Sequence, residues 1–265
     1  KILIWFFSLL TLGTLVCIIG YIVYNGAGYI SWDFITTINK PNEGLNGIFP
    51  MIISTLYMIA ITIVISTPIG ICTAVYLVEY SKPGKVLKTI RFAIETLSGI
   101  PSIIYGLFGF LFFVTLMQFG FSLLSGALTL SIMVLPTIIR TTEEALKSVP
   151  VYYREGSLAL GASKLTTIIR VVLPCAIPGI LTSVVLSIGR IVGETAALIF
   201  TSGIVPRTPE SLMSSGRTLA LHLYLLAANG ISFEQAFATA TILLIVVAVI
   251  NFIANRIAAG LKIKG

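Results

Sequence analysis

Residues 177–200 read IPGILTSVVLSIGRIVGETAALIF, an apolar stretch that carries Arg190 and Glu194 near its middle. A stretch of about 20 apolar residues is long enough to cross the hydrocarbon core of a membrane as a helix. A charged side chain at the centre of such a helix costs about 2.5–3.5 kcal/mol. A helical ion pair four residues apart returns only about 0.2–0.5 kcal/mol, and arginine before glutamate is the weaker order. We therefore expect both side chains to face protein or a water-filled cavity, not lipid.

The composition indicates the same class of protein. Hydrophobic residues make up 57% of the 265-residue chain and charged residues only 10%, whereas soluble domains average about 25% charged residues. We predict an all-α integral membrane protein with six transmembrane helices in a single domain over residues 1–265, the third interrupted by Glu95 and Pro101. The first is expected to be a retained helix, because it is longer than the core of a signal peptide. The predicted bounds are 2–24, 51–79, 92–119, 124–142, 175–201 and 235–257.

The basic residues predict the orientation of these helices. Thirteen of the 17 Lys and Arg residues flank one side, Lys40, Arg207 and Arg217 fall on the other, and Arg190 lies within a span. Because cytoplasmic loops carry the excess of basic residues, both termini are predicted to be cytoplasmic. This placement also accounts for the net charge of +7 without a nucleic-acid partner. The thirteen residues are Lys1, Lys82, Lys85, Lys88, Arg91, Arg140, Lys147, Arg154, Lys164, Arg170, Arg256, Lys262 and Lys264.

The outer segment between the last two spans contains LALHLYLLAA, residues 219–228, which is too short to cross the membrane. We expect a helix that lies at the outer surface or packs on the bundle, with His222 as a surface or interfacial residue. A single histidine argues against a multi-histidine metal site. The three cysteines, Cys17, Cys72 and Cys175, are interpreted as buried apolar side chains.

A cytoplasmic loop at residues 143–174 follows the fourth predicted span. Its first residues extend that helix as far as Pro150, which ends it. Residues 151–160 can form a short amphipathic helix, and Gly161 permits a turn. Ser163 can cap a second helix that runs through Val172 and stops before Pro174.

Two short helices bent at a glycine predict a compact knob on the cytoplasmic face. The alternative is a solvated linker, which would leave five apolar side chains exposed. These side chains are Leu158, Leu160, Leu165, Ile168 and Ile169.

The segment EGSLALGASKLTTIIRVVLP, residues 155–174, resembles the EAA loop of ABC-importer permeases. That pattern is Glu-Ala-Ala, three residues, Gly, nine residues and Ile-x-Leu-Pro. The resemblance implies a type I (MetI-like) importer fold, in which this loop docks on a separate ATPase subunit and couples it to the membrane helices. Glu155, Gly161, Leu173 and Pro174 match the pattern, whereas Gly156 and Ser157 replace the two alanines and Val171 replaces the isoleucine.

Helical spacing in the fifth span predicts a polar face, which we interpret as part of a substrate path. Its members are Ser187, Arg190, Glu194 and Thr201. A stripe of small residues beside it would let another helix approach closely. Its members are Gly189, Gly193 and Ala197. The alternative is a buried ion pair that only fixes the register of the helix.

The segment SIGRIVGETAALIF, residues 187–200, resembles the fifth-span motif of the phosphate-uptake (Pst) permeases. LSGIPSIIYGLFGF, residues 97–110, resembles another of their signatures, and the short N-terminal segment and the length favour the PstA branch over the PstC branch. The resemblance implies an ATP-driven phosphate importer in which this chain forms half of the translocation path. It fits Arg190, because a guanidinium offers a planar fork to phosphate oxygens, and Glu194, which can orient that fork.

The resemblance also implies partners: a PstC-like sister permease, two PstB-like ATPase subunits on the cytoplasmic side, and an extracytoplasmic PstS-like phosphate-binding protein. The expected location is a bacterial or archaeal cell (inner) membrane. The chain lacks a P-loop and a nucleophile–base pairing, so we expect no enzyme activity or cofactor of its own, with ATP and Mg on the partner ATPase.

Two other functions remain open. A permease for another oxyanion, such as sulfate or molybdate, is disfavoured by the GRxxGET stretch at residues 189–195. An ion-coupled carrier that works without ATP is disfavoured by the loop at residues 155–174, because a self-sufficient carrier has no need of a docking knob.

Overall fold

The computed structural model describes residues 1–40 and 45–261, which are almost entirely helical. A two-residue antiparallel pair, β1 (Asn39–Lys40) and β2 (Leu45–Asn46), is the sheet among these residues. The α-helices are α1 (Ile2–Gly26), α2 (Trp32–Thr36), α3 (Phe49–Val75), α4 (Lys85–Ser98), α5 (Ser102–Gly109), α6 (Leu123–Ser148), α7 (Val151–Ala159), α8 (Lys164–Thr167), α9 (Leu173–Val192), α10 (Ala196–Thr201), α11 (Leu219–Ala228) and α12 (Phe233–Leu261). Shorter helical turns are η1 (Ala27–Tyr29), η3 (Tyr76–Tyr80), η4 (Phe110–Leu116) and η5 (Ile168–Val172).

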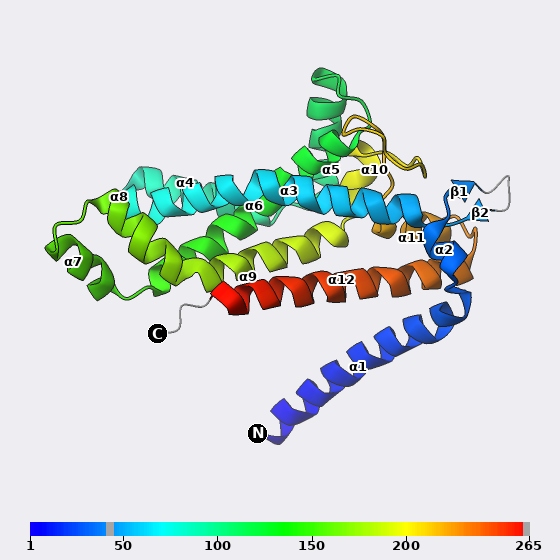
Figure 1. Cartoon of the computed structure of the whole chain (residues 1–265), viewed down its shortest axis with the longest axis horizontal. Coiled ribbons are helices and arrows are strands. Elements are labelled where there is room, and N and C mark those ends of the chain that lie inside the picture. The colour runs from blue at the N-terminus through cyan, green and yellow to red at the C-terminus, as the bar shows by residue number, and fades with distance from the viewer. Residues whose placement is uncertain (41–44, 262–265) are drawn as a thin grey trace.

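Five helical segments are long and apolar enough to cross a membrane, and a bent pair brings the number to six. The bounds of four of these helices agree closely with predicted spans, and those of the helix at Lys164–Val192 overlap the fifth predicted span in part. In Figure 1, α3, α6, α9 and α12 run side by side, whereas α1 diverges from this bundle and approaches it only near Gly26, which packs on Phe237 and Thr241. The first residues of α1 and the last turns of α12 point toward the end that carries α7 and α8, as the predicted topology requires (Figure 1). Lys262 and Lys264, which were counted in that prediction, lie outside the described residues.

The third predicted span, residues 92–119, is interrupted near Pro101, as the sequence indicates, but its first helix begins earlier than predicted and the span is sharply bent. The segment is α4 followed by α5 and η4, with a bend of 99° between the two halves. Pro101 has no backbone N–H to donate and disfavours helical geometry in the residue before it. The helix therefore ends at Ser98 and restarts at Ser102, and the second half projects away from the bundle axis (Figure 1).

The fifth span begins earlier than predicted, because Pro174 does not stop the helix. The chain is helical from Lys164 to Val192 without interruption. The π-helical turn η5 ends at Val172, two residues before Pro174, and the Leu173 N–H donates to the Ile168 carbonyl. Such a local π-helical adjustment re-satisfies backbone groups near a proline within a membrane helix. The cytoplasmic helix α8 and the membrane helix α9 are thus one rod.

The same span ends earlier than predicted. Its helix stops at Val192, and Gly193, Glu194 and Thr195 separate α9 from α10. The predicted continuous helix over residues 175–201 is therefore two pieces, and the break includes Glu194 and begins three residues after Arg190.

One core cluster forms where α3, α5, α6, α9, α10 and α11 meet, and it contains Tyr105, Leu130, Met133, Leu198 and Leu221. Small residues let these helices approach. A β-carbon on Gly106 would lie 2.8 Å from the Cα of Ala197. At Gly126 it would lie 2.9 Å from both the Met58 Cε and the Ser202 Cβ, so these contacts depend on glycine.

The short outer helix α11 packs on the bundle, as one of the two predicted alternatives states. His222 is only 2% exposed, so its prediction as a surface residue is wrong. The prediction that the cysteines are buried is also wrong: Cys17, Cys72 and Cys175 are all exposed on spanning helices. Because lipid is as apolar as a protein core, an apolar side chain in a spanning helix need not face inward.

Candidate functional site

The break in the fifth span is organised by Glu194. This side chain is 9% exposed, and its Oε1 accepts a hydrogen bond of 3.1 Å from the backbone N–H of Ala197. The Glu194 N–H in turn donates to the Ile191 carbonyl, at 3.2 Å. Glu194 thus satisfies an N–H group of the first turn of α10 that has no partner within the helix. The Glu194 carboxylate is therefore a hydrogen-bond acceptor for the backbone of α10.

Arg190 lies in the last turn of α9 and is partly exposed. Among the described residues no ion pair joins it to Glu194, so the carboxylate does not neutralise it. The Tyr105 hydroxyl is close enough to the Arg190 guanidinium to interact with it electrostatically. Tyr105 donates to the Leu97 carbonyl, at 2.7 Å, across the bend between α4 and α5. Arg190, which has no ion-pair partner among the described residues, therefore lies near the bend of the third span and the break of the fifth.

The predicted polar face of the fifth span is split by the break. Ser187 and Thr201 are fully buried, and their hydroxyls donate to the carbonyls of Ser183 and Ala197, each at 2.8 Å. Both side chains lie in the protein interior. The prediction that all four residues share one helical face is wrong, because the chain is not helical from Gly193 to Thr195.

The predicted packing stripe is also divided. Ala197 packs closely on Gly106 inside the chain. Gly189 and Gly193 are exposed, and a β-carbon on Gly189 would have no neighbour within 4 Å in the described part of the chain. Only Ala197 has the close-packing role within this chain.

The two sequence signatures at residues 97–110 and 187–200 lie against each other. Gly106 contacts Ala197, and Gly109 approaches Thr201 and Thr129 so closely that a β-carbon would clash. Neither sequence signature alone indicates that the two segments are in contact. The contacts of Gly106 and Gly109 place the bend of the third span beside the break of the fifth.

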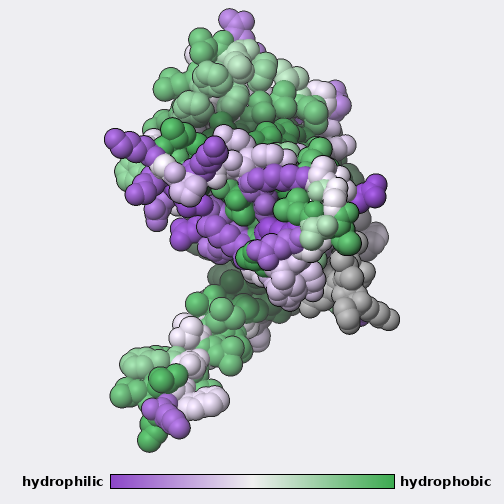
Figure 2. Space-filling model, turned by 90° about the vertical axis from the view of Figure 1, so that its left-hand side faces the viewer, coloured by the Kyte–Doolittle hydropathy of each residue, from purple (hydrophilic) through white to green (hydrophobic). Residues whose placement is uncertain are grey.

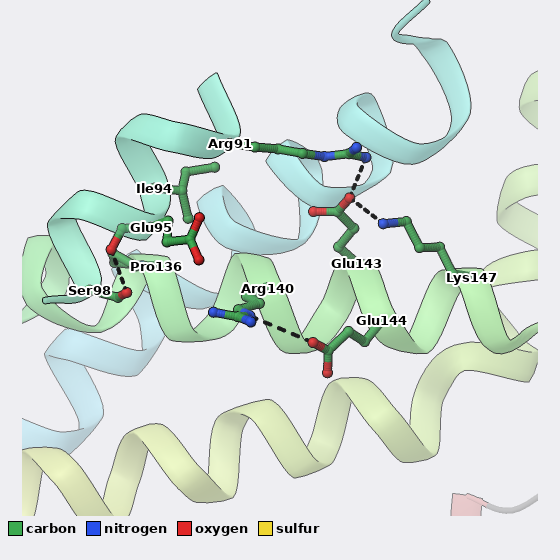
Figure 3. A pocket seen from close by; sticks show the side chains of 9 residues that line it. All are labelled: Arg91, Ile94, Glu95, Ser98, Pro136, Arg140, Glu143, Glu144 and Lys147. Carbon is green, nitrogen blue, oxygen red and sulfur yellow. Dashed lines mark hydrogen bonds and ion pairs between the residues drawn. The ribbon is translucent and has the colours of Figure 1, made fainter. Parts of the chain in front are cut away.

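A charged cavity of about 260 Å³ lies between α4 and α6 at the cytoplasmic end (Figure 3). Glu143 accepts from the Arg91 Nη2 at 2.5 Å and from the Lys147 Nζ at 2.7 Å, which binds α4 to α6. Arg140 and Glu144 form a longer exposed contact of 3.6 Å within α6. The sequence predicts these cations only as topology markers. Their clustering depends on the sharp bend after Ser98, and hydropathy does not indicate the angle of that bend. The lining also includes Ile94, Glu95, Ser98 and Pro136.

The cytoplasmic knob has the predicted turn. Gly161 has a φ of +83°, which favours glycine, and the Ser163 hydroxyl accepts from the Thr166 N–H at 3.2 Å. Glu155 and Gly156 are exposed, and the Ser157 hydroxyl bonds to that of Thr167 at 2.9 Å. Leu173 and Pro174 are partly buried in the rod that continues into the membrane.

A compact knob was predicted because it would bury five apolar side chains, and this reason is wrong in part. Of the five apolar side chains, only Ile168 is buried; the other four are exposed, Leu160 by 90%. Tyr152 and Tyr153 are also exposed on α7. Figure 2 looks onto this end of the molecule, where hydrophilic side chains gather with apolar ones among them. An exposed apolar patch with a polar rim is typical of a protein-interaction surface.

Comparison with known proteins places these features in a family. Residues 66–262 match the sequence pattern of the family described as "Binding-protein-dependent transport system inner membrane component". A probable ABC transporter permease, YqgI of Bacillus subtilis, is 37% identical over 252 residues, covering 90% of this chain and 86% of that protein. The phosphate transport system permease protein PstA 1 of Mycobacterium tuberculosis is 36% identical over 220 residues, covering 82% of this chain and 72% of that protein.

Two solved structures show the same fold at low sequence identity. A chain of the MetNI methionine ABC transporter, in inward-facing conformations, superimposes with a TM-score of 0.65 at 22% identity, covering 82% of this chain and 95% of that chain. A chain of a bacterial alginate ABC transporter superimposes with a TM-score of 0.69 at 17% identity, covering 99% of this chain and 93% of that chain.

Proposed function

The chain belongs to the binding-protein-dependent transport system inner membrane component family and is a permease of an ABC importer; from that membership we propose that its substrate is inorganic phosphate. The observation that carries the proposal is Arg190, a cation without an ion-pair partner in the described chain, at the point where two membrane segments break. The relatives named PstA support the choice of substrate.

Arg190 is the group that meets the anion in this proposal. Its fork of N–H donors matches phosphate oxygens, and it stays charged in a low-dielectric path. Glu194 fixes the position of the break, so that the guanidinium is presented on a defined backbone. Ser187 and Thr201 lie buried on the two helices that flank this break, α9 and α10. A single cation holds an anion less tightly than a closed cage of donors, which permits release.

The charged cavity between α4 and α6 suits the exit from this path. It lies toward the cytoplasmic end of α6, and its cations are already paired with carboxylates. Cations that are partly neutralised bind an anion only weakly. A weak binding site that follows a stronger one favours movement of the anion toward the cytoplasm.

The complete transporter in this proposal contains the partners that the family implies. A PstC-like sister permease supplies the other half of the path, and the exposed Gly189 and Gly193 are available to it. Two PstB-like ATPase subunits dock on the exposed knob and bind ATP and Mg. A PstS-like protein delivers phosphate at the outer face of a bacterial or archaeal inner membrane.

The test is transport by the complete complex in proteoliposomes. Uptake of radiolabelled phosphate should require ATP on the side of the ATPase subunits and should be outcompeted by unlabelled phosphate, but not by sulfate or molybdate. Competition by sulfate with equal strength would identify a permease for another oxyanion. Uptake that needs an ion gradient and no ATP would identify an ion-coupled carrier and exclude the proposal.

A further inference from the structure

We infer that Arg154 and Glu79 form a strap that fixes the coupling helix α7 to the cytoplasmic ends of α3 and α6, and that this strap positions α7 for energy coupling. The inference rests on the proposed function, because it concerns how the knob acts on the membrane helices. Neither residue belongs to the EAA-like pattern, and Arg154 was expected only to mark the cytoplasmic side.

The contacts of Arg154 involve every nitrogen of its guanidinium. Nε and Nη2 each lie 2.9 Å from the Glu79 Oε1. Nη1 donates to the Val149 carbonyl and Nη2 to the Leu146 carbonyl, both at 2.8 Å. One side chain of α7 thus holds the last turn of α6 and the turn η3 that ends the α3 span.

A second contact joins the other knob helix to the same turn. The Lys164 Nζ donates to the Glu79 carbonyl and lies 4.8 Å from the centroid of the Tyr80 ring. Residues 79 and 80 therefore meet both α7 and α8. The knob is attached to the second span as well as to the fifth, with which α8 is continuous.

Burial distinguishes this strap from the other ion pairs at this end. The side chains of Arg154 and Glu79 are 18% and 10% exposed, whereas Arg140 and Glu144 are 63% and 67% exposed. Exposed pairs contribute little because solvent screens them. A desolvated arginine with several aligned acceptors holds a fixed geometry. The strap therefore makes α7 move with α3 and α6, while its exposed apolar face stays free for the ATPase subunit.

The experiment compares Arg154→Gln, Glu79→Gln and the double variant in the complete reconstituted complex. Phosphate uptake, ATP hydrolysis and the amount of bound ATPase subunit are measured together. We expect each single variant to keep the ATPase subunit bound and to raise the ATP hydrolysed per phosphate transported by about tenfold, which corresponds to the loss of one charge-assisted hydrogen bond. Because both substitutions break the same contact, the double variant should be no worse than the poorer single variant.

A matched control is Arg256→Gln, which removes an exposed cation from α12, where it lies over Phe252. It should leave the coupling ratio unchanged. Arg154→Lys keeps the charge but has a single nitrogen for the three acceptors, so an intermediate ratio is expected. If Arg154→Gln fails to fold, Glu79→Gln carries the test, since it keeps the shape of the side chain.

Two outcomes would overturn the inference: a wild-type coupling ratio in both single variants, or loss of the ATPase subunit from a folded permease, which would make the strap a docking element. A failure of the proposed function is distinguishable, because the wild-type complex itself would then show no ATP-driven phosphate uptake.

Discussion

Glu194 accepts a hydrogen bond from the backbone N–H of Ala197, and this bond begins α10 immediately after α9 has ended. The carboxylate therefore has a structural task that does not require Arg190. This changes how substitutions of the two charged residues should be interpreted, because their effects need not resemble each other.

Removal of the cap should reduce stability more than removal of the charge. Glu194→Ala leaves the Ala197 N–H without its acceptor, which should cost about 1 kcal/mol. Glu194→Gln keeps an acceptor oxygen at the same position and should cost less. Thermal unfolding in detergent measures both. Equal losses for the two variants would mean that the charge, not the hydrogen bond, is what α10 needs.

Substitution of Arg190 should abolish transport without loss of folding. Arg190→Gln removes a charge that has no ion-pair partner in the described chain, so insertion and assembly should be normal while phosphate uptake falls to background. Arg190→Lys should also be impaired, because an ammonium cannot offer a planar fork. Uptake by proteoliposomes and the yield of assembled complex are the two measurements. Wild-type uptake by Arg190→Gln would remove this residue from the path.

Gly161 should tolerate asparagine better than valine. At a φ of +83° a β-branched residue is strained, whereas asparagine adopts this conformation more readily. Among the described residues, apart from its two chain neighbours, none would lie within 4 Å of a β-carbon at Gly161, so any defect arises from the backbone or from a partner protein. We expect Gly161→Val, but not Gly161→Asn, to lose ATP-driven uptake or the bound ATPase subunit.

Glu155→Lys tests the same surface through charge. Glu155 is exposed on α7, so the reversal should leave the permease folded and weaken retention of the ATPase subunit. Co-purification from membrane vesicles measures this. Full retention together with full uptake in both Glu155→Lys and Gly161→Val would mean that the loop at residues 143–174 is only a linker.

The close approach of α5 and α10 predicts a stability effect at Gly106. A β-carbon there would lie 2.8 Å from the Ala197 Cα, so Gly106→Ala must separate two backbones and should cost about 1–3 kcal/mol. Gly13→Ala is the matched control, because a β-carbon there would meet no atom within 4 Å outside its own helix in the described part of the chain. Unfolding of both variants in detergent gives the comparison, and equal stability would contradict the close contact.

Because the imidazole of His222 is buried, the protein should lose stability in acid. Burial and, secondarily, the Arg217 charge lower the pKa of this imidazole from 6.5 to about 3. Below about pH 6.5 the unfolded chain binds a proton that the folded chain refuses, so the free energy of unfolding falls as the pH falls, by about 2 kcal/mol at pH 5. His222→Gln should lose this part of the pH dependence. Thermal unfolding of both proteins between pH 7.5 and about pH 5 measures the difference.

The limits of the sequence-based prediction can be traced to particular residues. Hydropathy locates the spanning segments, because length and apolarity are local properties. It does not show that Pro101 bends the third span while Pro174 leaves the fifth intact. The outcome at each proline depends on the surrounding turn, which is π-helical only before Pro174.

The charged residues of the candidate site could be identified from the sequence, but their arrangement could not, because it also depends on the local backbone conformation. Arg190 and Glu194 are conspicuous in an apolar stretch, and helical spacing then suggested a shared face. That spacing has no meaning across Gly193 to Thr195, where the chain is not helical. The pairing of Arg154 with Glu79 joins residues that are 75 positions apart, and no local pattern indicates such a contact.

The unbroken helix through Pro174 also has a mechanical consequence. The 29 residues from Lys164 to Val192 form a rod about 43 Å long, at about 1.5 Å per residue. A tilt of about 10° at its cytoplasmic end would move the opposite tip by about 7 Å, more than one helical turn. Arg190 lies two residues from that tip. The rod is therefore a lever that enlarges a small rotation at the ATPase contact into a large displacement of the one charge proposed to hold the anion.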